Sequence, residues 1–544
     1  MKSFSSFKKK LNQICSCSYI KIACFSRSIW GLLVRWFRFI LFRVNPFFVL
    51  VFYFVSVSFV GFLILKLLNP KPSSFTPNDL DMFFTSVSAT TISSMSTVEM
   101  EVFSNTQLVV LTILMLVGGE VFASMLGLHF ATFKMEKNAA MIDNRVDSLS
   151  SNESADLSPT NPVDQIELGL VQTRKPSKAD LVSEVESLFS EDLRYNSTRC
   201  LISVIQCYLL VVHVAGSALV AVYVSLVSSA RDVLKNKGLQ FVTFCVFTTV
   251  STFANCGFIP TNENMLIFRK NYGLLLLLIP QALLGNALFP SCLRFLIWVL
   301  GRISKRDEFN YMLKNSEEMK YFHLLPSLHA RCLVVTVFWF LLLQFVVFSS
   351  MEWNSESLDG LNPFQKVVAS LFQAVNSRHT GESIVDLSSI SPAILVLFVV
   401  MMYLPAYTSF LPIKDDQQSS RSCKKRKIRW GRINVENLIF SQLSYLAISI
   451  ILICFTERKR IEEDPLNFSV FNIVIEVISA YGNVGFTTGY SCKRQLKPDS
   501  LCKDSWYGFV GRWSNKGKAI LILVMFFGRL KKLNMEGGRA WKLL

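Results

Sequence analysis

Long apolar runs alternate with polar segments along this chain, and many of the apolar runs are long enough to cross a lipid bilayer. A membrane-spanning helix needs about 20 predominantly apolar residues. The pattern predicts an all-α polytopic membrane protein with eight transmembrane helices, at Phe47 to Leu68, Leu108 to Phe133, Cys200 to Ser228, Gly273 to Leu300, Cys332 to Phe348, Ala393 to Leu411, Leu438 to Phe455, and Ala519 to the C-terminus.

A shorter segment of different character lies between the two helices of each successive pair. The first, Phe83 to Glu101, is rich in Ser and Thr and too short to span a bilayer. This is typical of a re-entrant pore loop, because irregular backbone at membrane depth is tolerated only where protein buries it or where it lines a water-filled cavity. Similar segments follow at Phe247 to Phe258, Phe372 to Glu382 and Ile478 to Phe486. We therefore predict four re-entrant pore helices that together form one pore.

Polar linkers separate the four predicted repeats and complete the domain organisation. We place a basic cytoplasmic N-terminus at 1–46, repeat 1 at 47–133, a flexible cytoplasmic loop at 134–199, repeat 2 at 200–301, a cytoplasmic linker at 302–330, repeat 3 at 331–413, a basic cytoplasmic linker at 414–434, and repeat 4 at 435–544.

The charge distribution predicts the orientation of the chain. Residues 1–44 carry nine Lys and Arg and no acidic residue, which by the positive-inside rule places the N-terminus and, with eight spans, both termini in the cytoplasm. The net charge of +17 does not indicate nucleic-acid binding, because the basic residues cluster between the apolar runs, where they serve topology and contact membrane lipids. Cys492 and Cys502 share one predicted outer loop, and whether they form a disulfide stays open.

Glycines at the turns of the four loops suggest a selectivity filter. Aligned at their turns, the loops place Ser96, Gly257, Gly381 and Gly485 in equivalent positions. Rings of backbone carbonyls can replace the water around a cation, and glycine reaches the required backbone conformations freely. A serine at one position either narrows the ring or adds a hydroxyl ligand. Both effects disfavour a larger ion relative to a smaller one.

Several charged residues flank the predicted filter. Glu99, Glu101, Glu263 and Glu382 are expected at the outer mouth, where they would concentrate cations; the alternative is that they are ordinary solvated loop carboxylates. Arg378 precedes Gly381 and is predicted to brace its loop by hydrogen bonds to neighbouring carbonyls or by pairing with Glu382.

A second group suggests a barrier below the filter. Arg529 interrupts the last apolar run, and a charge at that depth is a functional hypothesis by default. We consider Glu120, in the second helix, as its partner, and the bend at Pro405 as part of a gate that Arg529 braces. The alternative is that Arg529 reaches the inner membrane boundary beside two lysines.

The four loop sequences resemble the pore regions of the plant HKT family of sodium/potassium transporters, relatives of the microbial Trk/Ktr potassium transporters. The motifs are SSMSTVEMEVFSN, STFANCGFIPTNENM, VNSRHTGESIVDLSSISPAILVLF and ISAYGNVGFTTGYSCKR, and the resemblance covers the chain from about Phe47 onward. It implies four membrane–pore loop–membrane repeats around a pseudo-fourfold pore and a homodimer with one pore per subunit. It also implies a plasma-membrane location and a role in sodium retrieval and salt tolerance.

Within that family, serine at the first filter position and glycine at the other three resembles the sodium-selective class. The resemblance therefore implies that Na⁺ binds at Ser96, Gly257, Gly381 and Gly485. The sequence therefore favours a passive sodium transporter without a cofactor; the alternative is a Na⁺/K⁺ co-transporter or a K⁺-permeable uniporter on the same scaffold. An embedded enzyme is not favoured, because such enzymes need clustered histidines or a nucleophile with its base, and the five histidines are scattered. Channel-like and carrier-like permeation both stay open.

Overall fold

The computed structural model of the chain describes residues 46–71, 76–133, 135, 178–319, 321–410, 442–496 and 502–534. The basic N-terminus up to residue 45, most of the 134–199 loop and the basic linker 414–434 lie outside these residues. The chain divides into two compact units, Met1–Val57 and Ser58–Leu544, and all contacts reported below are within the second.

Helices form nearly all of the regular structure. The described residues contain no β-strand and one isolated β-bridge, between Tyr490 and Ser505, which confirms the helical class. In chain order the α-helices are α2 (Pro46–Leu67), α3 (Asp79–Thr91), α4 (Asn105–Gly118), α6 (Lys178–Leu226), α7 (Ser228–Asn236), α8 (Phe241–Ala254), α9 (Tyr272–Leu284), α10 (Phe289–Ser304), α11 (Asp307–Lys314), α12 (Ser327–Glu352), α13 (Pro363–Asn376), α14 (Pro392–Tyr403), α16 (Gln442–Thr456), α17 (Arg458–Glu463), α18 (Val470–Gly482) and α19 (Asn515–Asn534).

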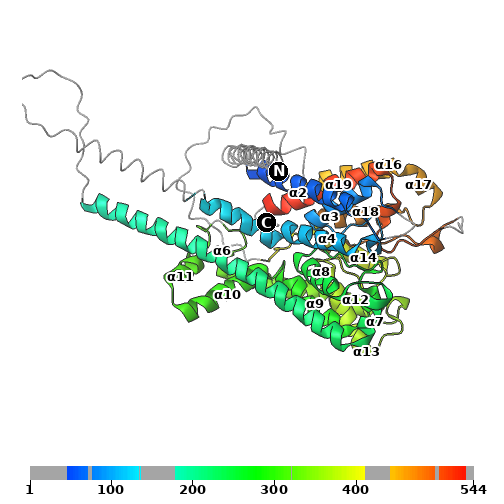
Figure 1. The fold of residues 1–544 in the computed structure, drawn as a ribbon, viewed down its shortest axis with the longest axis horizontal. Helices are drawn as coiled ribbons and strands as arrows, with labels where there is room; N and C mark the ends of the chain where they lie inside the picture. Colours follow the sequence, from blue (N-terminus) through cyan, green and yellow to red (C-terminus); the bar gives the residue numbers. More distant parts are fainter. Residues whose placement is uncertain are drawn as a thin grey trace, which may run out of the picture. The chain divides into compact units, whose positions relative to one another are not determined.

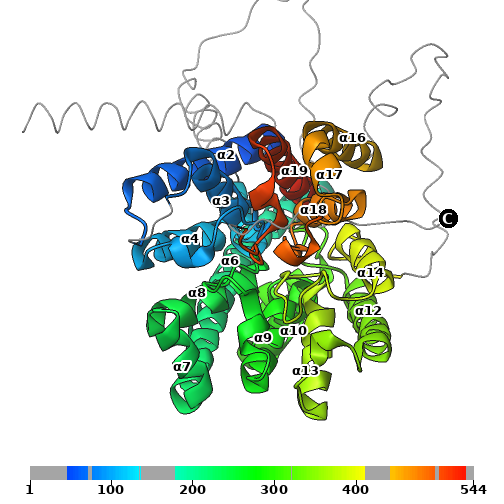
Figure 2. The same cartoon turned by 90° about the vertical axis from the view of Figure 1, so that its right-hand side faces the viewer.

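Pairs of helices are arranged around a common centre. In Figure 2, α3 and α4, α8 and α9, α13 and α14, and α18 and α19 follow one another around this centre in chain order. The packing agrees: α3 packs on α4, α4 on α8, α8 on α9, and α9 on α13, while α12 links α13 to α14. α14 then packs on α18, α18 on α19, and α19 returns to α3, so the ring of helices is closed.

The short helices α3, α8, α13 and α18 have 13 or 14 residues each, about 20 Å of helix, which is less than a bilayer requires. Local sequence fixes where they begin. Asn362 and Gln365 form a capping box at the start of α13, and the Ser469 side chain accepts the N–H of Asn472 at the start of α18. Their inner halves are buried among the other helices.

Among the described residues, three helices are long and apolar enough to span a membrane: Phe47–Leu67, Asp192–Leu226 and Ser327–Glu352. Two bent pairs raise the number to five, because Glu120–Phe133 follows α4 at an angle of 56° and α10 follows α9 at 81°. Figure 1 shows α6, 49 residues long, running without a break. At 1.5 Å per residue it extends about 70 Å, more than twice the thickness of the hydrocarbon core.

The eight expected spans are thus not all continuous helices. α14 ends at Tyr403 because Pro405 follows, and a proline disfavours the helical conformation of the residue before it. The described part of α16 begins at Gln442, four residues after the expected start. Eight spans remain a prediction.

The loop between α18 and α19 contains a disulfide. Cys492 and Cys502 are bonded, with their Cα atoms 5.9 Å apart, which answers the question that the sequence left open.

Candidate functional site

Each short helix of the ring ends in a tight turn, and we call these segments the four turns. After α3, α8 and α18, the next residue has a left-handed backbone and a second positive φ follows two residues later. These φ values are 59° at Ile92 and 52° at Ser94, 60° at Asn255 and 80° at Gly257, and 49° at Asn483 and 100° at Gly485. The third turn differs: α13 ends on a right-handed residue, and one positive φ, 68°, follows at Gly381.

The four turns touch one another edge to edge. A Cβ atom on Gly257 would lie 1.7 Å from a backbone carbonyl oxygen of the third turn, and one on Gly381 would lie 2.1 Å from a carbonyl oxygen of the fourth. A Cβ on Gly485 would lie 2.2 Å from the Cβ of Ser94, whose hydroxyl oxygen is 3.3 Å from the corresponding point on Gly257. The contacts run from turn to turn and close into a ring, so no side chain fits at the three glycines.

Ser94, rather than Ser96, occupies the first position of this ring. Ser94 has the positive φ and the contacts to Gly257 and Gly485, whereas Ser96 lies two residues further along. The Ser96 hydroxyl donates to the carbonyl of Val98 (2.6 Å), and its own carbonyl packs against Gly508. The alignment that equates Ser96 with the glycines therefore does not match the backbone geometry.

The sequence carries a signal for this register that the alignment did not use. In three turns, the N–H before the second positive-φ residue bonds a serine carbonyl five residues back: Ser93 to Ser88, Cys256 to Ser251, and Val484 to Ser479. A serine therefore stands six residues before Ser94, Gly257 and Gly485 alike. Counting from these serines selects Ser94.

Buried polar side chains hold the segments that leave the turns. Glu382, expected at the outer mouth, is instead fully buried and accepts the hydroxyl of Thr252 from α8. Glu476 of α18 is equally buried and accepts the hydroxyl of Thr487 and the N–H of Thr488 (3.2 Å). These carboxyl groups tie neighbouring segments together, because a buried polar group needs hydrogen-bond partners. Sequence reasoning missed Thr252 and Glu476.

The other three predicted mouth carboxylates gather near the start of α8. The Lys237 ammonium lies 2.8 Å from Glu101 and 2.7 Å from Glu263. Asn262 connects the group: its N–H donates to Glu101 (3.1 Å) and its side-chain amide to Glu99 (3.3 Å). Burial alone would lower the pKa of Lys237, but its hydrogen bonds and its attraction to Glu101 and Glu263 raise that pKa above its ordinary value. The sequence analysis identified the glutamates but not Lys237 or Asn262.

Arg378 is buried and holds the chain after α14. Its guanidinium donates to the carbonyls of Pro405 (2.7 Å) and Ala406 (3.3 Å) and lies 4.7 Å from the ring centre of Phe340. Of the two expected interactions, the structure thus contains hydrogen bonds to carbonyls. The segment beyond Pro405 is held further by Tyr407, whose hydroxyl is 2.9 Å from His323.

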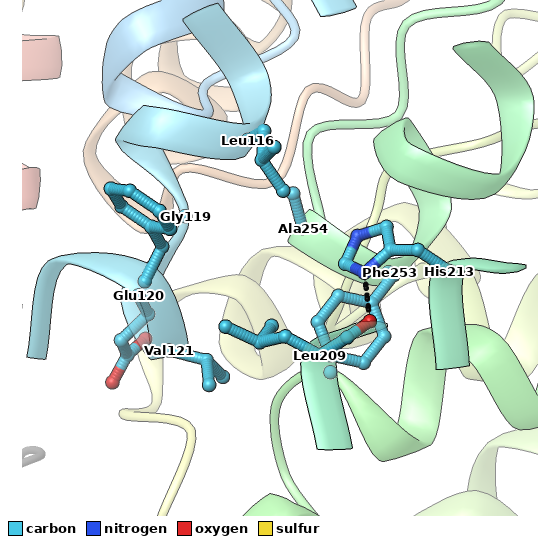
Figure 3. Close-up of a pocket in the computed structure, with 10 residues that line it drawn as sticks. Leu116, Gly119, Glu120, Val121, Leu209, His213, Phe253 and Ala254 are labelled. Atoms are coloured by element: carbon cyan, nitrogen blue, oxygen red, sulfur yellow. Dashed lines mark hydrogen bonds between the residues drawn. The ribbon is translucent and has the colours of Figure 1, made fainter. Parts of the chain in front are cut away.

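Arg529 is buried and donates to the carbonyl of Gly118, the last residue of α4. Beside this helix break, Glu120 is one of the residues that line a small cavity of about 10 Å³, shown in Figure 3. His213 faces the cavity from α6 and donates to the carbonyl of Leu209 (2.7 Å), while the Glu120 carboxylate points away from it. Arg529 thus contacts the residue two positions before Glu120, and its pairing with Glu120 stays a prediction. The Pro405 carbonyl is bound by Arg378.

The chain is similar to known cation transport proteins. A family model described as "TrkH: Cation transport protein" matches residues 177–535. "Sodium transporter HKT1" of Arabidopsis thaliana is 52% identical, covering 88% of this chain and 91% of the relative. "Cation transporter HKT1;3" of Oryza sativa subsp. japonica is 47% identical over 98% of each chain. Among solved structures, the potassium transporter TrkH from Vibrio parahaemolyticus aligns with a TM-score of 0.46 and 14% identity, covering 90% of this chain and 84% of that one.

Proposed function

Because this chain belongs to the HKT group of the TrkH family of cation transport proteins, we propose that it conducts sodium passively through a pore lined by the four turns. The family is one of transporters and not of enzymes. A relative that is 52% identical carries the name sodium transporter, which supports the choice of ion. The observation that carries the proposal is Ser94 at a position where the other three turns have glycine.

The chemistry of selection follows from the ring. Positive-φ turns expose backbone carbonyls, which replace the hydration shell of a cation. Ser94 adds a hydroxyl at the first position and prevents the close approach that glycine allows. The smaller ring favours the smaller of the two abundant monovalent cations. A left-handed serine costs roughly 1–2 kcal/mol of backbone strain, which is a sign that its side chain is retained for function.

A Na⁺/K⁺ co-transporter or a K⁺-permeable uniporter is the alternative on the same scaffold. The two proposals differ at one side chain, so substitution of that side chain separates them. Reversal potentials would be measured under voltage clamp for wild type, Ser94→Gly and Ser96→Gly while external Na⁺ and K⁺ are varied. Ser96→Gly is the matched control, because Ser96 is two residues away and its hydroxyl donates to Val98 of its own loop.

We expect wild type and Ser96→Gly to follow sodium alone and Ser94→Gly to respond to potassium as well. With Na⁺ alone on one side and K⁺ alone on the other, a tenfold gain in relative potassium permeability shifts the reversal potential by about 59 mV. Glycine at position 94 relieves strain, so folding should not suffer. A wild type that already follows potassium would favour the alternative. A response confined to Ser96→Gly would return the filter role to Ser96.

The barrier below the filter is part of the same proposal. Arg529 at the break after α4, together with the Pro405 segment held by Arg378, would raise the energy of a cation leaving the filter inward. Arg529→Gln should increase inward sodium current without changing the reversal potential. Unchanged current would indicate that Arg529 serves only to hold the helix break.

We further propose eight spans with both termini cytoplasmic, a plasma-membrane location and a homodimer with one pore per subunit. The Cys492–Cys502 disulfide supports an outer position for its loop, because disulfides persist in oxidising environments. After mild reduction, an impermeant thiol reagent applied to intact cells should label these cysteines. Labelling only after permeabilisation would reverse the topology. The role in sodium retrieval and salt tolerance that the family resemblance implies rests on the selectivity tested above.

A further inference from the structure

Lys237 occupies an unusual place in the outer-mouth cluster. Its ammonium lies between carboxylates that belong to two repeats, 2.8 Å from Glu101 of the first and 2.7 Å from Glu263 of the second. Its side chain is 19% exposed, and those of the two glutamates 23% and 34%, so the group is largely shielded from water. An attraction in such surroundings is screened far less than one at the open surface.

The cluster has the ligands that a hard divalent cation prefers. Calcium takes six to eight oxygen ligands from carboxylates, amide carbonyls and water at 2.3–2.6 Å. Glu101 and Glu263 converge on one point, and Asn262 holds Glu99 and Glu101 on the same side. At that point the chain places an ammonium of its own, which supplies one positive charge and three donors.

We propose that Lys237 is a resident cation of the outer mouth, which keeps these carboxylates from binding divalent cations while sodium passes. The proposal rests on the sodium conduction proposed above. An open carboxylate cluster would attract sodium but would also hold calcium, whose double charge binds more tightly at the same ligands. Lys237 offsets one of the two negative charges of Glu101 and Glu263, and Glu99 remains to attract the permeant ion. Selectivity between monovalent and divalent cations is thus determined at the mouth, apart from the ring.

A purely structural role is the competing explanation, in which Lys237 only ties the α7–α8 connection to the loops beside it. Such a role predicts lower expression or current on substitution, but no new sensitivity to divalent ions. The two explanations therefore differ in a measurement that protein yield does not affect.

The test is the sodium current of Lys237→Met under voltage clamp at increasing external Ca²⁺. Methionine keeps the length of the side chain and removes its charge. Weak extracellular calcium sites bind at about 10⁻⁴–10⁻³ M, so we expect half-block near 1 mM and about a tenfold smaller current at 10 mM. Wild type and Lys237→Arg should show only the small decrease that ionic screening produces.

Two further variants make the test specific. Lys237→Met/Glu263→Gln should lose the acquired block, because a carboxylate needed for calcium is gone. Lys66→Met removes an ion pair of equal length, 2.7 Å from Asp79, that is 52% and 69% exposed, and should behave as wild type. Block in Lys66→Met as well, or unchanged calcium response in a Lys237→Met that conducts sodium, would overturn the proposal. Absence of sodium current in wild type would instead refute the proposed function.

Discussion

Lys518 and Asp81 form a buried ion pair that joins the last helix of the ring to the first. Lys518 lies in the first turn of α19 and Asp81 in the first turn of α3, with 2.7 Å between the ammonium and the carboxylate and side-chain exposures of 8% and 7%. We predict that Lys518→Met destabilises the protein strongly, because it leaves the Asp81 carboxylate buried without its partner.

The magnitude follows from distance and burial. At 2.7 Å and an effective dielectric constant of about 20, the attraction is about 6 kcal/mol, most of which offsets the cost of removing two charges from water. Removing one partner of a buried pair costs about 3–5 kcal/mol. Replacing both by apolar residues, as in Asp81→Leu/Lys518→Met, should cost much less, since no charge is then left buried.

The assay is heating in detergent, followed by size-exclusion chromatography to find the temperature at which half of the monodisperse protein is lost. The two single variants should both fall well below wild type, and the double variant should lie above both. Lys66→Met is the control, because an exposed pair contributes about 0.2–1 kcal/mol. A double variant whose loss equals the sum of the single losses would refute the coupling of the two charges.

Three other predictions concern single contacts. Thr252→Val should lower stability by about 1–3 kcal/mol and reduce the sodium current, because it removes a hydrogen bond to the buried Glu382. Thr252→Ser keeps the hydroxyl and should retain wild-type stability and current. Equal effects of the two variants would contradict the role of the hydroxyl. Gly118→Ala should abolish folded protein, because its Cβ would lie 2.0 Å from a backbone carbonyl oxygen. Gly127→Ala, with nothing within 4 Å, should stabilise the protein by up to about 1 kcal/mol and so raise the half-loss temperature. Because Glu101 and Glu263 raise the pKa of Lys237, its ammonium should lose its charge only as pH rises through that pKa. The wild-type sodium current should therefore stay insensitive to calcium from about pH 6 to 9. Calcium sensitivity that appears by pH 9 would count against the role of the Lys237 charge.

The helical class and the places of the loops could be read from the sequence, because both depend on local patterns. Apolar runs predict helices, and Ser, Thr and Gly clusters between them predict turns, so Gly257, Gly381 and Gly485 were identified directly. The register of the first turn was not, because SSMS offers three serines and composition does not distinguish them. A backbone angle and a contact with Gly485, far away in the sequence, identify Ser94. The one local signal, a serine six residues earlier, gains its meaning only from the hydrogen bond that its carbonyl accepts in the folded turn.

Long-range charge pairing was similarly beyond the sequence. An acidic residue beside a predicted filter suggests a carboxylate at the pore mouth. Glu382, however, is buried against Thr252, and Glu101 and Glu263 both pair with Lys237. The spacing of residues within a motif says nothing about which carboxylate a distant lysine will reach. Helix continuity also escaped prediction: the run from Leu108 to Phe133 is apolar on both sides of the 56° bend, and Gly118, Gly119 and Glu120 at the bend were not taken as a helix break.

The ring closes between the first and last repeats, and this has a consequence for how the protein is made. The side-chain amide of Asn483 donates to the hydroxyl of Ser93 across 390 residues of chain, and α19 packs on α3. During synthesis the first turn leaves the ribosome long before Asn483 has been made. Until then its polar groups need hydrogen bonds from other molecules. A chain that is truncated before α19 therefore lacks the helix that closes the ring. We expect such truncated chains to be degraded, so mutations that introduce a stop codon before α19 should abolish transport completely.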